Sequence, residues 1–481
     1  MKLENALQHY FGYNTFRPGQ REIIEALLDG QDVVAILPTG MGKSLCYQLP
    51  GYLFSKPVLI ISPLLSLMQD QVDQLKQRGE KRVVALNSFL TPDQKRYALY
   101  YLHEYRFIFV SPEMLLQPQV KARIEQMELS LIVADEAHCI SQWGFDFRPD
   151  YLRIGEVLAI PKRAPILALS ATATDEVLED IKTYLTMQTP FQYMHSVNRE
   201  NIYLAKKYFS TKEDKMNWIL EHVTQTAGPG IIYTQSRAKT EAISLRLLEQ
   251  NVAAAAYHAG KDAQDRQFIQ QQFITGKLEW IVATNAFGMG VHKDNIRQIV
   301  HETMPATLSN YMQEIGRAGR DGQEAVAFLL YSEGDAQHAK FIATEDLPKA
   351  VQIDRYVQAA ANGENPYEFV KKGELGEVAF RVIHYWLQQE SADDLKNRMA
   401  TLQTTKFAEV NVVLNLVEQP TCMRQQVVNY FGQQLNNPQN PCCSNCGLNE
   451  FLFLAKRKKP HSTEQMTNWQ QRLQQILQRN L

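Results

Sequence analysis

The sequence lacks the features of a membrane or secreted protein. No apolar run approaches the ~18 residues that a membrane-spanning helix needs. The first residues, Met1 to Asn5, do not contain the apolar core of a signal peptide. Cysteine is scarce, with 6 in 481 residues, and the isolated Cys46 and Cys139 are interpreted as buried and reduced. We therefore expect a cytoplasmic protein that has no membrane partner.

An excess of one charge is missing as well. The formal net charge is −2 and the sequence pI is about 6.6. Bulk charge therefore does not indicate nucleic-acid binding, and such a function must depend on local features. Neither short repeats nor low-complexity tracts occur. The contents of 45% hydrophobic and 21% charged residues are ordinary for a globular protein, and the length suggests roughly three domains.

Short β-branched runs alternate with longer amphipathic stretches up to about residue 330, a pattern typical of buried parallel strands between helices. The first series comprises residues 32–37, 58–62, 106–110, 131–134 and 166–169. The second series comprises residues 231–233, 253–257, 280–284, 299–301 and 325–330. The simplest interpretation is two successive α/β units with parallel sheets, joined near residues 197–201.

The strand pattern stops at about Glu345, and residues 345–418 are predicted to be largely helical. A polar loop, residues 433–440, leads into a cluster of cysteines. The last stretch opens with the basic run from Lys456 to Lys459, and Ser462 with Gln465 fits a helix capping box. Apolar residues follow at helical spacing: Met466, Trp469, Leu473 and Ile476.

A glycine-rich segment directly follows the first predicted strand. It consists of Thr39, Gly40, Met41, Gly42, Lys43 and Ser44. Glycines let backbone N–H groups approach phosphates, and the next helix directs its N-terminus at them. Lys43 would reach the β- and γ-phosphates of ATP, and Ser44 would bind Mg²⁺. Leu37 stands where the full pattern has glycine, so a simple glycine-rich turn is the alternative.

Two acidic residues, Asp135 and Glu136, follow the predicted strand at residues 131–134. Asp135 would hold Mg²⁺ through water, and Glu136 would polarise the attacking water. Acids at this position are otherwise often a solvated strand end. Their occurrence together with the glycine-rich segment favours an ATP-hydrolysing site.

The second predicted α/β unit supplies two arginines. Residues 313–320 contain Gln313, Arg317 and Arg320, and the spacing of the arginines predicts that both lie on one face of a helix. Arg320 is the candidate arginine finger, which stabilises charge on the γ-phosphate, and Arg317 would support it. Gln313 is included among the nucleotide-binding candidates.

In this order the motifs resemble those of superfamily 2 helicases, and further matches narrow the resemblance to the RecQ family. Residues 13–20 resemble the family's adenine-recognition segment, in which Tyr13 and Arg17 would stack on the base and Gln20 would bind its exocyclic edge. Further motifs match at residues 62–64, 170–172, 257–260 and 283–290. The resemblance covers about residues 8–330 and the cysteine region.

Residues 141–149 carry the sharpest mark of the family, an aromatic-rich loop close to Glu136. Its candidate DNA-binding residues are Gln142, Trp143, Phe145, Phe147 and Arg148. Aromatic side chains can stack on single-stranded bases, at about 1–3 kcal/mol per base. The loop would signal to the ATP site that DNA is bound. The alternative is that these aromatics, Phe147 above all, fill the crevice between the lobes.

The cysteine cluster also resembles the family, whose zinc subdomain carries one cysteine on a helix and three after a loop. The candidate ligands are Cys422, Cys442, Cys443 and Cys446. Cys443 and Cys446 have good zinc spacing, whereas Cys442 departs from the usual pattern because it adjoins Cys443. Reduced, buried thiols without a metal are the alternative.

Many family members continue with a winged helix and an HRDC domain. Only 35 residues follow Cys446, too few to bury such a core. We expect a short form without these modules, in which residues 345–420 carry a substitute of unknown kind.

The resemblance implies two RecA-like parallel-sheet lobes followed by a helical zinc-binding subdomain. The expected division is a first lobe at residues 1–200, a second at 201–343, a helical zinc-binding region at 344–450 and a basic tail at 451–481. It also implies an ATP-dependent 3′→5′ DNA helicase of DNA repair and recombination, with ATP, Mg²⁺ and Zn²⁺ as cofactors.

The expected partners are single-stranded and forked DNA and a single-stranded-DNA-binding protein. We expect a monomer associated with the nucleoid. The alternatives are an RNA helicase of the Asp-Glu-Ala-His type, a DNA translocase or remodeller that does not unwind robustly, and an ATP-gated DNA-binding module.

Overall fold

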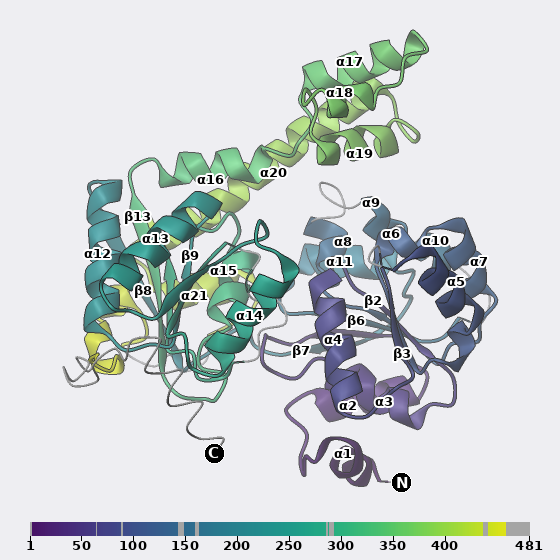
Figure 1. Cartoon of the computed structure of the whole chain (residues 1–481), viewed down its shortest axis with the longest axis horizontal. Coiled ribbons are helices and arrows are strands. Elements are labelled where there is room, and N and C mark those ends of the chain that lie inside the picture. The colour runs from purple at the N-terminus through teal and green to yellow at the C-terminus, as the bar shows by residue number, and fades with distance from the viewer. Residues whose placement is uncertain are drawn as a thin grey trace, which may run out of the picture.

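The computed structural model of the chain contains two α/β lobes that lie side by side, with a helical arm above them (Figure 1). It describes residues 2–63, 65–87, 90–142, 149–158, 163–284, 287, 293–435 and 441–457. Both lobes are built on parallel sheets. The predicted fold class, two RecA-like lobes followed by a helical region, is confirmed.

The sheet of the first lobe has the strand order β3-β4-β2-β5-β6-β1-β7 in the described part of the chain. The strands are β1 (Val33–Ile36), β2 (Val58–Ile61), β3 (Val83–Leu86), β4 (Phe107–Val110), β5 (Leu131–Ala134), β6 (Ile166–Ser170) and β7 (Phe191–Met194). Helices cover both faces, which buries β1, β2, β4, β5 and β6 throughout their length.

The helices of this lobe are mostly short. They are α1 (Leu3–Phe11), α2 (Gln20–Leu28), α3 (Leu45–Leu53), α4 (Leu65–Gln77), α5 (Pro92–Tyr100), η1 (Leu102–Glu104), α6 (Pro112–Leu115), α7 (Pro118–Glu125), α8 (Cys139–Gln142), α9 (Pro149–Leu152), α10 (Ile154–Leu158) and α11 (Asp175–Tyr184).

The sheet of the second lobe has the order β10-β11-β9-β12-β13-β8 among the described residues. Its strands are β8 (Ile202–Phe209), β9 (Gly230–Tyr233), β10 (Ala254–Tyr257), β11 (Trp280–Ala283), β12 (Gln298–His301) and β13 (Ala325–Ser332). Its helices are α12 (Lys212–Gln225), α13 (Arg237–Glu249), α14 (Ala263–Ile274) and α15 (Leu308–Ile315). Residues 195–201, here named the interlobe linker, separate β7 from β8.

Each strand predicted from the β-branched runs is present. The three strands that the pattern did not reveal are β3, β7 and β8, and all three lie at a sheet edge. Edge strands bury fewer side chains. In β7 exposed and half-buried residues alternate, and β8 is buried only over its first half. A search for continuous apolar runs therefore does not detect β7 or the whole of β8, whereas β3 is apolar and mostly buried, and its edge position does not explain why it was missed.

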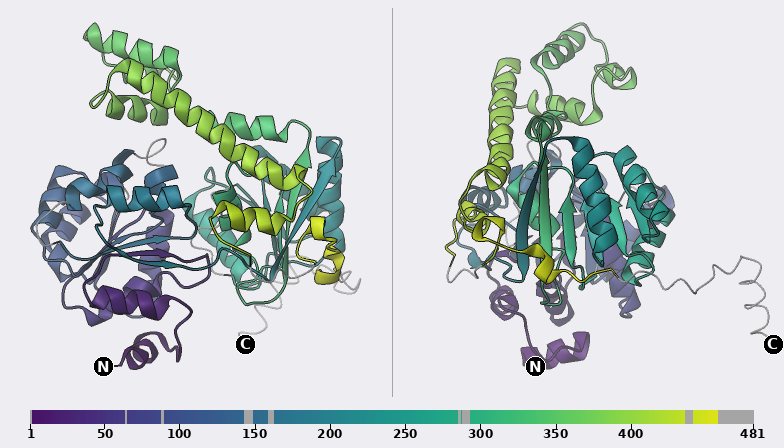
Figure 2. Two further views of the ribbon diagram at one scale, coloured as in Figure 1. Left: turned by 180° about the vertical axis from the view of Figure 1, so that it is seen from behind. Right: turned by 90° about the vertical axis from the view of Figure 1, so that its left-hand side faces the viewer.

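The helical arm is formed by residues 345–418. After α16 (Asp335–Thr344) it contains α17 (Ala350–Ala361), α18 (Glu368–Lys371), α19 (Glu377–Trp386) and α20 (Ala392–Glu418). The 27-residue α20 runs diagonally from the arm to the second lobe (Figure 2). Its N-terminal Leu395 and Met399 join the hydrophobic core of the first lobe, and its C-terminal Val413 and Val417 join that of the second. One helix thus connects both lobes.

The chain then returns to the second lobe through α21 (Met423–Tyr430), η2 (Ser444–Cys446) and η3 (Glu450–Phe453). Phe453 stacks on Tyr203 with ring centroids 3.9 Å apart. Lys456 pairs with Thr226, and Arg457 forms an ion pair with Glu279 at 2.7 Å. Lys456 and Arg457, the first two residues of the basic run, therefore lie against the second lobe. Lys458, Lys459 and the predicted amphipathic helix lie outside the described residues.

Over the described residues, no helix combines the length and apolarity needed to cross a membrane.

Candidate ATP site and zinc site

The glycine-rich segment connects β1 to α3, as expected. Gly40 has φ 90° and Gly42 has φ 76°, backbone conformations that favour glycine. Ser44 is the N-cap of α3 and its side chain makes no capping hydrogen bond to the helix, so the hydroxyl remains available for another partner. The segment therefore has the two features of a phosphate-binding loop: a permissive backbone and a helix N-terminus directly behind it. We call residues 39–44 the P-loop.

Asp135 and Glu136 extend from the carboxyl end of β5. Lys43 Nζ lies 3.3 Å from Glu136 Oε1, with both side chains largely buried. Glu136 adopts φ 51°, an uncommon conformation for a residue with a side chain. The N–H of Glu136 donates to Asp135 Oδ1 at 3.0 Å, and the Tyr151 hydroxyl donates to the Asp135 carbonyl. The P-loop lysine and both acids are thus fixed within one site.

Burial and the charge of Glu136 raise the pKa of Asp135 to about 7. Burial also acts to raise the pKa of Glu136, but Lys43 and His138 outweigh this effect, and the net shift is downward. Glu136 therefore stays ionised and can accept a proton. The hard carboxylate of Asp135 and the hydroxyl of Ser44 are oxygen ligands that suit Mg²⁺, which would neutralise charge on the phosphates when bound.

His138 connects the acid pair to the second lobe. Its Nδ1 lies 3.0 Å from Ser170 Oγ, and its Nε2 lies 3.2 Å from Nε2 of Gln313 on α15. Burial lowers the pKa of His138, so the imidazole is neutral at pH 7. The sequence placed Gln313 among the nucleotide-binding residues. In the structure its amide donates to this histidine of the other lobe.

Arg317 and Arg320 do not share a helical face, because α15 ends at Ile315 and both lie in the loop that follows. We call residues 316–321 the arginine loop. Gly319, within this loop, adopts φ 55°, a backbone conformation that favours glycine. Arg317 is buried and its charge helps to lower the pKa of Glu136. A Cβ added to Gly40 would lie 3.1 Å from Cγ of Arg320, so Arg320 packs against the P-loop.

Burial, together with Arg317, lowers the pKa of Arg320 to about 10. Its guanidinium therefore remains charged at neutral pH. The two lobes place a lysine, two carboxylates and two arginines around the P-loop, which is the set of groups that phosphoryl transfer requires.

The adenine-recognition segment lies beside the P-loop. Tyr13 is 53% exposed, which leaves its ring open for stacking. Arg17 donates to the Gly40 carbonyl. Gln20 is buried, and its amide donates to the carbonyls of Met41 and Gly42 at 3.0 and 3.1 Å. Gln20 and Arg17 thus hold the P-loop backbone, a role that the sequence did not assign to either residue.

Most of the aromatic-rich loop lies outside the part of the chain that the structure describes. Trp143, Phe145, Phe147 and Arg148 lie outside the described residues, as does the side chain of Gln142 at the end of α8. The loop is flanked by α8 and α9, and α9 packs against α19 of the arm.

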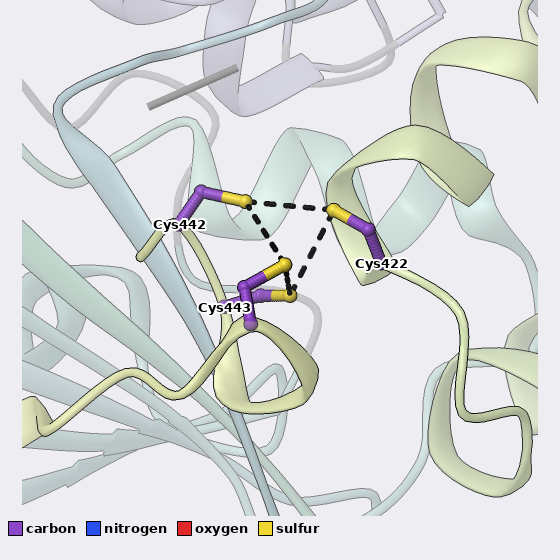
Figure 3. A group of neighbouring side chains, drawn as sticks. Cys422, Cys442 and Cys443 are labelled. Carbon is purple, nitrogen blue, oxygen red and sulfur yellow. Dashed lines mark hydrogen bonds between the residues drawn. The ribbon is translucent and has the colours of Figure 1, made fainter. Parts of the chain in front are cut away.

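Cys422 is the N-cap of α21, Cys442 and Cys443 directly precede η2, and Cys446 is the last residue of η2. Figure 3 shows Cys422, Cys442 and Cys443 pointing toward one another. The ligand atoms of all four cysteines lie within 4.8 Å of one another. The Sγ atom of Cys442 is 3.5 Å from that of Cys422 and 3.9 Å from that of Cys446. Cys443 Sγ is 3.9 Å from Cys422 and 3.6 Å from Cys446.

A tetrahedral zinc with Zn–S bonds of about 2.3 Å separates its sulfurs by about 3.8 Å. The observed distances fit this geometry, and Cys442 fits it as well as the other three. The adjacent residues Cys442 and Cys443 can therefore both contribute a sulfur to one metal site.

Two further arginines bind backbone carbonyls near the ATP site. Arg199 in the interlobe linker contacts both the P-loop and the arginine loop, and Arg424 on α21 contacts the linker. The sequence analysis missed both, because a single arginine in a connecting segment or on a helix belongs to no motif.

Comparisons with known proteins agree with this geometry. Residues 17–181 match the family model described as DEAD/DEAH box helicase, residues 214–322 match the helicase conserved C-terminal domain, and residues 380–447 match the RecQ zinc-binding family.

The probable ATP-dependent DNA helicase RecS of Bacillus subtilis is 39% identical over 99% of this chain and 98% of its own length. The ATP-dependent DNA helicase RecQ of Haemophilus influenzae is 35% identical over 92% of this chain, and the chain spans 63% of that protein.

Among solved structures, Dbp5 of S. cerevisiae bound to RNA and ADP BeF3 aligns with a TM-score of 0.58 at 18% identity, over 72% of this chain and 90% of that one. The DUF1998 helicase MrfA bound to DNA aligns with a TM-score of 0.56 at 18% identity, over 71% and 52% of the two chains. These likenesses concern the fold alone.

Proposed function

The chain belongs to the RecQ family of ATP-dependent DNA helicases, and from this premise we propose that it uses ATP hydrolysis to move 3′→5′ along single-stranded DNA and to unwind duplexes. The observation that carries the proposal is the ATP site, in which Lys43 and Glu136 of the first lobe meet the arginine loop of the second. A site divided between two lobes can convert hydrolysis into their relative movement.

We assign the steps of hydrolysis to individual residues. Lys43 binds the β- and γ-phosphates, and Ser44 and Asp135 hold Mg²⁺. Ionised Glu136 orients the attacking water and accepts its proton. Arg320 stabilises charge that develops on the γ-phosphate, and Arg317 supports it. Gln20 shapes the P-loop, and Tyr13 and Arg17 contact the adenine.

We propose that Cys422, Cys442, Cys443 and Cys446 hold one zinc ion. Zinc stabilises cysteine thiolates and would join the helix α21 to η2. The support is the set of sulfur distances and the match of residues 380–447 to the RecQ zinc-binding family.

For DNA, we retain the aromatic-rich loop, residues 141–149, as the contact to single-stranded bases. The proposed setting is the cytoplasm at the nucleoid, where a monomer would act in repair and recombination on single-stranded and forked DNA. A single-stranded-DNA-binding protein is the proposed protein partner.

Strand displacement tests the proposal. Purified protein is incubated with duplexes that carry a 3′ tail, a 5′ tail or no tail, with ATP and with a non-hydrolysable ATP analogue. We expect unwinding of the 3′-tailed duplex only, and only with ATP. Preferential unwinding of the 5′-tailed duplex would overturn the polarity. Lys43→Ala serves as the matched inactive control.

A translocase that does not unwind robustly is the second candidate, and the charge of the arm favours it. The arm carries more acidic than basic residues. Most of its described cations pair with carboxylates of the arm itself, namely Arg355, Lys371, Arg381, Lys396 and Arg398. These pairs leave little positive charge to grip duplex phosphates.

Displacement of streptavidin from the biotinylated end of a single strand separates the two candidates. A translocase removes the streptavidin but leaves tailed duplexes intact, whereas a helicase does both. A DNA-binding module gated by ATP would do neither, and its ATP turnover would not increase with DNA.

A further inference from the structure

The interlobe linker is held by the segment that carries the zinc-ligand cysteines. Arg424, two residues after Cys422, donates to Asn198 Oδ1 at 2.6 Å, to the Arg199 carbonyl at 2.9 Å and to the Ile202 carbonyl at 2.5 Å. Arg424 is only 5% exposed, so these three bonds satisfy a buried charge. A connection between two moving lobes would ordinarily be free to flex, but this one is fixed.

A second residue of the same region reinforces the hold. Oε1 of Gln433, just after α21, accepts from the Val197 N–H at 2.9 Å, and its Nε2 donates to the His195 carbonyl at 3.4 Å. A small cavity lies between the linker, α15 and α21, lined in part by Val197, Met312 and Val427. Hydrogen bonds therefore define the path of the linker together with the burial of Val197 in the core of the second lobe.

The guanidinium of Arg199, in the middle of this linker, spans the nucleotide cleft. Its NH1 donates to the carbonyl of Thr39 in the P-loop at 3.4 Å. Its NH2 donates to the carbonyls of Ala318 and Gly319 at 3.3 and 2.8 Å. Those two residues lie between the two arginines of the arginine loop. Asn201 adds a further bond to Gly319 at 2.8 Å.

We propose that Arg199 is a positioning residue for ATP hydrolysis, which sets the separation of the P-loop from the arginine loop, and that Arg424 sets Arg199 by holding the linker. The two arginines act in series: Arg424 fixes the backbone of Arg199, and the Arg199 side chain joins the two halves of the site. The cysteine-bearing segment thereby controls the chemistry without touching the nucleotide.

The test is ATPase kinetics of Arg199→Ala, Arg424→Ala and the double variant in the full chain. A displacement of about 1 Å in a catalytic group can lower turnover by about 10²-fold, so we expect each single variant to lose about 10- to 100-fold in kcat. Binding of a non-hydrolysable ATP analogue and the zinc content should stay close to wild type. Because the residues act in series, the double variant should be no slower than the slower single variant.

Arg106→Ala is the matched control, since Arg106 also donates to a backbone carbonyl, that of Gly51 at 2.8 Å, but lies away from the cleft. It should lose thermal stability and keep kcat. Arg199→Lys should recover only part of the turnover, because one ammonium cannot reach carbonyls on both sides of the cleft as a planar fork does. If Arg424→Ala does not fold, Arg424→Lys and Gln433→Ala replace it.

An unchanged kcat in folded Arg199→Ala overturns the positioning role. Multiplicative losses in the double variant, or loss of analogue binding and zinc in place of turnover, overturn the series arrangement. The reference is the ATPase of the wild-type chain, so these outcomes are distinct from a failure of the proposed strand displacement.

Discussion

The hydrogen bond between His138 and Gln313 joins the catalytic acids to the second lobe, and its removal should weaken closure of the site. Neutral His138 has one ring N–H. Gln313 can only donate through its amide nitrogen, so Nε2 of His138 accepts this bond and Nδ1 carries the proton. Nδ1–H then donates to Ser170 Oγ, whose own hydroxyl donates to the Thr172 carbonyl at 2.7 Å. Each donor in this series of hydrogen bonds, from Gln313 to the Thr172 carbonyl, therefore meets an acceptor.

The size of the effect follows from the number of bonds lost. One neutral hydrogen bond contributes about 0.5–1.5 kcal/mol net. If the bond exists only when the lobes are closed, its loss reduces the closed fraction by about 2- to 13-fold, with the same decrease in kcat/KM. We expect Gln313→Ala to show this loss, and the coupling energy between His138→Ala and Gln313→Ala to be about 0.5–1.5 kcal/mol.

The assay is DNA-stimulated ATP hydrolysis by both single variants and the double variant between pH 6.5 and 8. Protonation of His138 would remove the acceptor, but burial lowers the pKa of His138, so the bond forms above that pKa and is lost only as the pH falls through it. The coupling should therefore not weaken as the pH rises through this range. Additive single effects, or a coupling that disappears already at pH 7, would refute the assigned bond.

Four further predictions concern the roles proposed above. Lys43→Ala and Glu136→Gln should abolish ATP hydrolysis and retain single-stranded DNA binding in a fluorescence-anisotropy titration; near wild-type hydrolysis by either would mean that the site is wrong. Arg320→Ala should lower turnover by about 10³-fold with little change in ATP affinity, because the group acts in the transition state; lost affinity with normal turnover would reverse the assignment. Trp143→Ala with Phe145→Ala should keep basal ATPase and lose its stimulation by DNA, and normal stimulation would reduce the loop to packing. Metal analysis should find one zinc per chain, lost in Cys446→Ser; zinc-free protein purified without chelators would contradict the site, and Cys442→Ser tests the adjacent cysteine separately.

Local pattern was enough to predict the two lobes and most members of the ATP site. Buried parallel strands favour β-branched runs, and a phosphate-binding loop requires glycines before a helix. Both features are therefore recognisable as motifs of consecutive residues. Lys43, Asp135 and Glu136 belong to such motifs, and the structure brings the three residues together. The four cysteines were also visible as a cluster, although only Cys443 and Cys446 had the usual zinc spacing. The position of Cys442 was open until the structure placed its sulfur at the same distances as the others.

The structure corrected expectations that depended on how segments meet in space. Arginine spacing predicted a shared helical face, but α15 ends before Arg317. For Gln313 the structure adds a contact that the sequence did not show, a hydrogen bond from its amide to His138 of the other lobe. The arm was known only as helical, and its connection to both lobes by α20 became visible through the cores at its two ends.

The sequence by itself determined which residues are able to perform ATP chemistry, because reactive groups and permissive backbones are properties of short segments. Tertiary structure alone decided which groups face one another across the cleft. Arg199 and Arg424 show the difference: their partners are backbone carbonyls, which every residue possesses. Because every residue has a backbone carbonyl, such a hydrogen bond does not depend on which residue accepts it. The sequence therefore gives no sign of the bond, and only the folded structure reveals it.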